Sequence, residues 1–230
     1  MRDPRGGWRE REANATRNIL HRAAAWVSVG GSELSSPPDS AEPSVPLAQG
    51  GDGPREDDGM NTGRKCAAAD AIRLLVLDVD GVLTDGRLYF GSRGEALKAF
   101  HARDGYGIRQ LISSGVAVAV ISGRRSAAVS ARCRELGIAP VLLGVADKLA
   151  AFARLRKRAR VAARECACVG DDLPDVPLFS LVGLSFAVAD AHPLARRAAD
   201  HVTALPGGLG AVREVCDRLL AARARAGRGT

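Results

Sequence analysis

The chain has 230 residues, of which 46% are hydrophobic but only 4% aromatic, so its core must consist mainly of Ala, Val, Leu and Ile. The formal charge of +7 comes mostly from Arg without interleaved aromatic residues, which argues against a protein that binds single-stranded nucleic acid. The apolar runs are shorter than the roughly 20 residues needed to span a bilayer. Five scattered cysteines do not form a disulfide framework. We therefore expect a cytoplasmic protein without nucleic-acid or membrane partners.

The first 70 residues differ in composition from the rest of the chain. The segment 29–65 is rich in Gly, Ser, Pro, Asp and Glu, and buries too little apolar surface to offset the entropy lost on ordering. We therefore predict that residues 1–70 form a disordered or poorly ordered extension, and that residues 71–230 form the folded domain.

From residue 71 onward the pattern alternates between strands and helices. A buried strand is expected at 72–79, a hairpin within 86–100, a helix at 104–115 capped by Asp104, and a second strand at 116–122. Further helices and strands are then expected in turn at 125–137, 141–144, 146–159, 166–172, 173–182, 184–189, 192–199, 201–205 and 210–226. This order predicts an α/β, Rossmann-like three-layer sandwich with a mostly parallel sheet, one β-hairpin insertion after the first strand, and no cap domain.

Polar and charged residues stand where several predicted strands end. Asp78 and Asp80 close the first strand, Ser122 closes the second, and Asp171 closes a later one, while Lys148 begins a helix. Ligands of parallel sheets bind at this edge. Gathered carboxylates repel one another and need a counter-charge, and Mg²⁺ is a hard cation that suits oxygen ligands beside a phosphate. Each Asp alone is more simply explained as a turn or helix cap.

Taken in order, these segments resemble the motifs of the haloacid dehalogenase-like phosphatase superfamily. The matching stretches are DVDGVLTDG (78–86), Ser122, Lys148 and GDDLPD (170–175), and the resemblance covers about residues 72–220. It implies that Asp78 is a nucleophile that forms an aspartyl-phosphate and that Asp80 is the general acid and base. It also implies that Mg²⁺ is held by Asp78, Asp171 and the backbone carbonyl of Asp80. Ser122 and Lys148 would hold the phosphoryl group.

The spacing of the motifs narrows the choice within the superfamily. The gaps from Asp80 to Ser122 and from Lys148 to Asp171 are too short for a cap domain. With the loop at 101–105, this is similar to capless, tetrameric sugar-acid phosphatases of lipopolysaccharide precursor synthesis. That resemblance implies a homotetramer and an eight-carbon sugar-acid phosphate substrate. The implied substrate contacts are Asp80, His101, Ala102, Arg103, Asp104, Gly105, Arg109, Arg124, Arg132 and Lys148.

Two positions depart from the pattern of these relatives, and two other functions stay open. Pro174 stands where Asn is usual, and Leu209 stands where Arg is usual, which bears on substrate affinity more than on the chemistry. The same motifs would also serve a phosphatase for nine-carbon sugar acids such as sialic acid or its deaminated analogue. A non-catalytic module related to the tails of sialic acid cytidylyltransferases is the other alternative.

Overall fold

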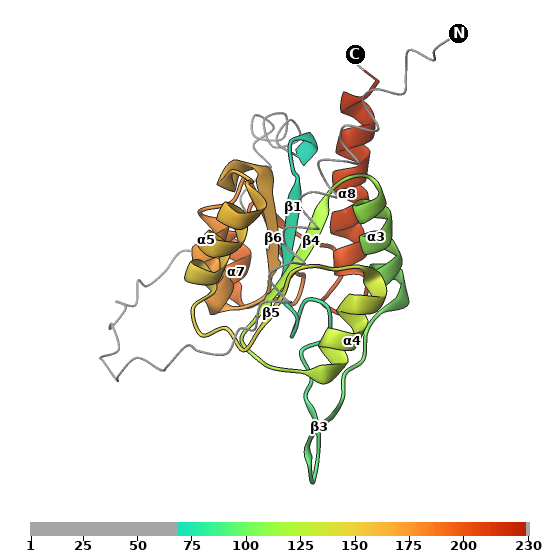
Figure 1. The fold of residues 1–230 in the computed structure, drawn as a ribbon, viewed down its shortest axis with the longest axis vertical. Helices are drawn as coiled ribbons and strands as arrows, with labels where there is room; N and C mark the ends of the chain where they lie inside the picture. Colours follow the sequence, from blue (N-terminus) through green and yellow to red (C-terminus); the bar gives the residue numbers. More distant parts are fainter. Residues whose placement is uncertain (1–68, 229–230) are drawn as a thin grey trace.

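The computed structural model describes residues 69–228, and within them six parallel strands form one sheet in the order β5-β4-β1-β6-β7-β8 (Figure 1). The predicted extension therefore lies almost entirely outside the described residues. The strands are β1 (Leu74–Leu77), β4 (Ala117–Ser122), β5 (Val141–Leu143), β6 (Cys166–Gly170), β7 (Leu184–Ala187) and β8 (His201–Val202).

Helices cover both faces of this sheet. Figure 1 shows α5 and α7 on one face and α3 and α8 on the other, which confirms the predicted α/β sandwich. The helical segments are α3 (Ala102–Ser113), α4 (Ala127–Leu136), α5 (Lys148–Ala159), η1 (Ala163–Glu165), η2 (Leu173–Asp175), α6 (Val176–Phe179), α7 (Pro193–Ala198) and α8 (Ala211–Ala226). None of the described helices is long and apolar enough to cross a membrane.

The central strands are apolar along their whole length because both of their faces are covered. Every residue of β1 and β4 is buried, including Ser122 at the end of β4. Continuous apolar runs of this kind are typical of parallel strands between two helical layers. β1 pairs with β4 on one side and with β6 on the other, so the residues that follow these three strands lie at neighbouring positions on one edge.

The predicted hairpin is present as β2 (Tyr89–Gly91) and β3 (Gly94–Leu97), which pair antiparallel. It projects away from the sandwich in Figure 1, and no cap domain is present among the described residues.

Helix α3 begins earlier than the sequence predicts. The expected cap was Asp104, but the helix starts at Ala102 with His101 at the N-cap position. Asp104 is buried, and its Oδ1 accepts a hydrogen bond of 2.7 Å from the backbone N–H of Arg213 in α8. A tertiary contact between two helices thus uses the carboxylate that local sequence rules assign to capping.

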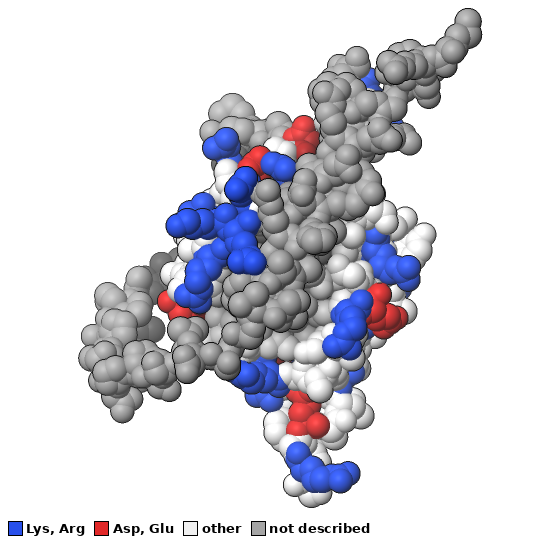
Figure 2. All heavy atoms as spheres, viewed as in Figure 1, with Lys and Arg blue, Asp and Glu red and all other residues white. Residues whose placement is uncertain are grey.

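Basic side chains gather over α5, from its middle to its C-terminal end (Figure 2). They are Arg154, Arg156, Lys157, Arg158 and Arg160, most of them exposed. Cations in the last turn interact favourably with the helix dipole. These five cations therefore lie away from the end of α5 that meets the strand ends.

A glycine pair packs tightly against the loop that follows β1. A Cβ atom on Gly207 would lie 1.6 Å from the carbonyl oxygen of Gly81, and the N–H of Gly208 donates a 2.9 Å hydrogen bond to the carbonyl of Val82. The backbone of this pair therefore supports the loop that carries Asp80.

We predict that Gly207→Ala destabilises the protein, because the added methyl group must displace the backbone at Gly81. Overpacking of this kind costs about 1–3 kcal/mol, which lowers the melting temperature by several degrees in a domain of this size. Thermal unfolding measures the effect. Gly227→Ala is the control, since its Cβ would meet its nearest neighbour at 3.6 Å. A melting temperature equal to that of the wild type would contradict the tight packing of Gly207.

Candidate active site

Carboxylates from two strand ends meet around one lysine. Asp78 follows β1 directly, and Lys148, the first residue of α5, places its Nζ 2.9 Å from Asp78 Oδ2. The same Nζ lies 2.7 Å from Oδ1 of Asp175, which ends η2. Ligand atoms of Asp78, Asp171 and Asp175 all lie within 4.8 Å of one another. Of the three carboxylates that the sequence predicts to gather, Asp78 and Asp171 therefore lie together, Asp175 joins them, and Asp80 is not part of this group.

The crowding of these carboxylates alters their protonation. Burial and the charge of Asp175 raise the pKa of Asp78 to about 6, although Lys148 opposes the shift. Burial and the charges of Asp78 and Asp175 raise the pKa of Asp171 to about 8. For Lys148, burial favours the neutral form, but the adjacent carboxylates outweigh it and raise its pKa. The cluster thus holds more negative charge than Lys148 neutralises.

The oxygen atoms of this cluster fit a divalent cation. Within the described residues, Oδ1 of Asp171 is buried and has no hydrogen-bond partner. Gly81 leaves room beside it, because a Cβ atom there would lie 2.0 Å from Asp171 Oδ2. Hard carboxylate oxygens beside a phosphate site are the ligands that Mg²⁺ prefers. The donor set therefore agrees with the predicted Mg²⁺ cofactor.

Asp175 is a site residue that the sequence reasoning did not select. It is buried, and its Oδ2 accepts hydrogen bonds from the N–H groups of Asp171 (3.2 Å) and Asp172 (3.5 Å). Its other oxygen accepts from Lys148. One carboxylate thus fixes both the lysine and the turn that carries Asp171. Its place at the end of GDDLPD was a usable signal, because a residue four positions after Asp171 can fold back onto that turn.

Asp80 lies outside the carboxylate cluster, between two cations. Its Oδ1 accepts a hydrogen bond from Lys98, and its Oδ2 lies 3.6 Å from Arg124 Nε. Ser122 is buried at the end of β4, and its Oγ accepts a 3.4 Å hydrogen bond from the N–H of Arg124. The predicted residues Asp80, Ser122 and Arg124 are therefore near neighbours.

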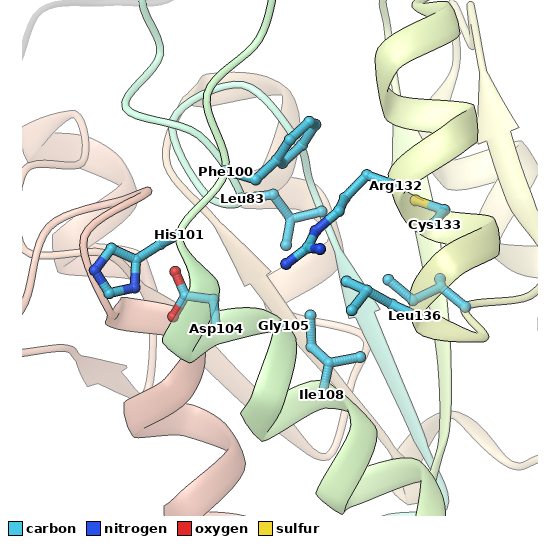
Figure 3. Close-up of a pocket in the computed structure, with 10 residues that line it drawn as sticks. Leu83, Phe100, His101, Asp104, Gly105, Ile108, Arg132, Cys133 and Leu136 are labelled. Carbon is cyan, nitrogen blue, oxygen red and sulfur yellow. The ribbon is translucent and has the colours of Figure 1, made fainter.

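The residues predicted to contact the sugar lie in different parts of the structure. His101, Asp104, Gly105 and Arg132 line one pocket with Leu83, Phe100 and Ile108, and none of the clustered carboxylates borders it (Figure 3). Gly105 permits this packing, because a Cβ atom there would lie 2.3 Å from Arg132 Nη2. In contrast, Ala102, Arg103 and Arg109 are exposed on α3.

Some residues of this pocket make contacts that stabilise the fold. Asp104 binds the start of α8, as described above, and burial raises its pKa. Arg132 forms a 2.9 Å ion pair with Glu135 on the same helix. Within the described residues, buried polar atoms of His101, Asp104 and Arg132 lack hydrogen-bond partners. Their contact with substrate stays a prediction.

Comparison with known proteins agrees with this site. A family model for haloacid dehalogenase-like hydrolases matches residues 141–207. The 3-deoxy-D-manno-octulosonate 8-phosphate phosphatase of Escherichia coli K12 is 54% identical over 159 residues, which cover 69% of this chain and 85% of that protein.

Solved structures give the same result. The phosphatase of that name from Yersinia pestis superposes with a TM-score of 0.69 at 49% identity, over 70% of this chain and 88% of the other. The one from Moraxella catarrhalis, in complex with magnesium, phosphate and KDO, gives a TM-score of 0.69 at 39% identity, over 74% and 97% of the two chains. The resemblance found in the sequence motifs is confirmed: this chain belongs to the 3-deoxy-D-manno-octulosonate 8-phosphate phosphatase family of haloacid dehalogenase-like hydrolases.

Proposed function

We propose that the protein is a Mg²⁺-dependent phosphomonoesterase that converts 3-deoxy-D-manno-octulosonate 8-phosphate to the free sugar acid and phosphate, in lipopolysaccharide precursor synthesis. The observation that carries this proposal is the contact of Asp78 with Lys148 inside a carboxylate cluster at the strand ends. A nucleophile, a cation that binds phosphate and carboxylates that bind metal thus lie together at the strand ends. The match to the relatives over most of their length supports the choice of substrate.

The reaction proceeds in two displacements. In the first, a carboxylate oxygen of Asp78 attacks phosphorus, the bond from phosphorus to the sugar oxygen breaks, and Asp80 donates a proton to that oxygen. In the second, Asp80 takes a proton from water and the water oxygen attacks phosphorus of the aspartyl-phosphate. The bond between phosphorus and the Asp78 oxygen breaks, which restores the Asp78 carboxylate and releases phosphate. When bound, Mg²⁺ would be held by Asp78, Asp171 and the backbone carbonyl of Asp80, and would neutralise charge between nucleophile and phosphate.

Other side chains bind and orient the transferred group. Lys148 supplies a positive charge to the phosphoryl oxygens, and Asp175 keeps its ammonium group beside Asp78. The Ser122 hydroxyl at the neighbouring strand end donates to a phosphoryl oxygen. The predicted contacts with the carboxylate and hydroxyl groups of the sugar come from His101, Ala102, Arg103, Asp104, Gly105, Arg109, Arg124 and Arg132, since guanidinium groups suit a carboxylate.

The hairpin supports a homotetrameric assembly. Its side chains Leu88, Tyr89, Phe90 and Leu97 are exposed in the described chain. Apolar residues gathered on a projecting hairpin are typical of a subunit contact. An open, capless site also needs cover to exclude water, which a neighbouring subunit can provide. We place the protein in the cytoplasm, which agrees with the free, buried thiols of Cys133, Cys166, Cys168 and Cys216.

A substrate panel tests the proposed function. We expect phosphate release from the eight-carbon sugar-acid phosphate to require Mg²⁺, to stop with EDTA, and to exceed release from the nine-carbon analogue in kcat/KM. Asp78→Asn should lower kcat by more than about 10³-fold because it removes the nucleophile. Asp217→Asn, at an exposed ion pair on α8, is the control. Faster turnover of the nine-carbon substrate would reassign the substrate, and an active Asp78→Asn variant would reassign the nucleophile.

Asp175→Asn tests the arrangement of Lys148. The amide cannot accept hydrogen bonds at both of its ends, so either Lys148 or the turn at Asp171 loses its partner. We expect kcat to fall by about 10–10²-fold, in line with losses for residues that orient ligands of a site, together with weaker Mg²⁺ activation. Asp172→Asn is the matched control, because Asn can still accept from the N–H of Leu173. Equal activities of the two variants would contradict the role of Asp175.

The raised pKa values of Asp78 and Asp171 predict how stability depends on pH. Without metal, the folded protein binds more protons than the unfolded chain between about pH 4 and pH 8, so its free energy of unfolding falls as pH rises through that interval. Mg²⁺ binds the deprotonated carboxylates, so it should raise the melting temperature more at pH 8.5 than at pH 5.5. Asp171→Asn should reduce this difference between the effects of Mg²⁺ on the melting temperature at the two pH values. A larger effect of Mg²⁺ at pH 5.5 would contradict the assignment.

A further inference from the structure

Lys98, at the base of the hairpin, is an enclosed cation in contact with Asp80. It follows β3 directly, and only 1% of its side chain is exposed. Its Nζ donates a hydrogen bond to Oδ1 of Asp80, which lies 18 residues earlier in the chain. Lysine is almost never enclosed in this way unless it is paired. None of the four motifs that identify the family contains this residue.

A second carboxylate fixes Lys98 from the other side. Glu95 Oε2 lies 3.6 Å from Lys98 Nζ, and Glu95 Oε1 accepts a hydrogen bond from the hydroxyl of Ser126. Ser126 is also the N-cap of α4, where its Oγ accepts from the N–H of Val129 at 3.3 Å. A continuous series of polar contacts therefore runs from the start of α4 through Glu95 and Lys98 to Asp80.

The two oxygens of Asp80 have different surroundings. Oδ1 contacts the enclosed Lys98, whereas Oδ2 faces Arg124, whose side chain is 42% exposed and stacks over the ring of Phe90. An ammonium group donates hydrogen bonds and cannot accept them. Oδ1 must therefore act as an acceptor, whereas the guanidinium group of Arg124 stays 3.6 Å from Oδ2, which leaves Oδ2 available to a substrate or water. The contact with Lys98 thus limits rotation of the Asp80 carboxyl group.

We propose that Lys98 is a positioning residue for the reaction and acts through Asp80, with Glu95 and Ser126 holding its ammonium group in place. Lys98 keeps Oδ1 occupied, so that Oδ2 donates its proton to the leaving sugar oxygen and later takes one from water. This inference rests on the proposed function in one respect, the assignment of Asp80 as general acid and base.

The test compares leaving groups in Lys98→Met. A sugar-acid phosphate leaves as an alkoxide and needs the proton, whereas 4-nitrophenyl phosphate and acetyl phosphate release stable anions that do not. General acid catalysis contributes about 10²–10⁴-fold. We expect kcat/KM of Lys98→Met to fall at least tenfold more for the sugar-acid phosphate than for the other two substrates. Lys157→Met, on the exposed face of α5, should leave all three values unchanged.

Two further variants separate positioning from loss of structure. Adding Lys98→Met to Asp80→Asn should cause less than a twofold further loss, because a residue that acts through Asp80 has nothing left to position. Glu95→Gln should reproduce the leaving-group bias in weaker form, and it carries the test if Lys98→Met does not fold. Equal losses for all three substrates, a change in KM alone, or additive losses in the double variant would overturn the inference.

The same data distinguish this inference from the proposed function. If Asp80→Asn itself shows no leaving-group bias, the assignment of Asp80 is wrong. If Asp80→Asn shows the bias and the folded variants of Lys98 and Glu95 do not, Asp80 keeps its role and the role of Lys98 is wrong.

Discussion

The confinement of several carboxylates around one ammonium group is the constraint on which the site depends. Asp78, Asp171 and Asp175 approach within 4.8 Å at the sheet edge, and Lys148 offsets only part of their charge. Burial strengthens the repulsion because little solvent screens it. The remaining negative charge is what a divalent cation can neutralise. Lower stability of the metal-free protein is therefore expected from a site that gathers carboxylates to bind Mg²⁺ beside Asp78.

The sheet topology determines which residues share this constraint. β1 lies between β4 and β6, so Asp78, Ser122 and Asp171 come from three adjacent strand ends although they are far apart in the sequence. The crossover from β5 to β6 brings α5, which begins at Lys148, to the same edge. Backbone contacts of Gly207 and Gly208 then support the loop after β1. The fold thus supplies the proximity that the chemistry requires.

The sequence predicts the features that follow from the order of elements and from local residue patterns. It does not predict side-chain contacts between segments that are far apart in the chain. The alternation of elements was sufficient to predict the sandwich, and the places of Asp78, Lys148 and Asp171 at the edges of predicted segments were sufficient to predict that they lie near one another. Asp104 was assigned to a helix cap, but a contact with α8 uses its carboxylate. Asp175 was overlooked because its partners, apart from the adjacent turn, come from another helix. Nothing local indicates that Lys98 reaches Asp80, because that contact spans the hairpin.

A capless enzyme must cover its site and position its side chains without an additional domain, and the hairpin lies where it can affect both. Its strands expose Phe90 and Leu97, on which the proposed subunit contact rests, while Lys98 at its base touches Asp80. Arg124 bridges these regions, because its guanidinium group lies near Asp80 and over the ring of Phe90. A subunit that packs on the hairpin would restrict the side chains around Asp80, the proposed general acid. Assembly and proton transfer would then depend on the same short segment of chain.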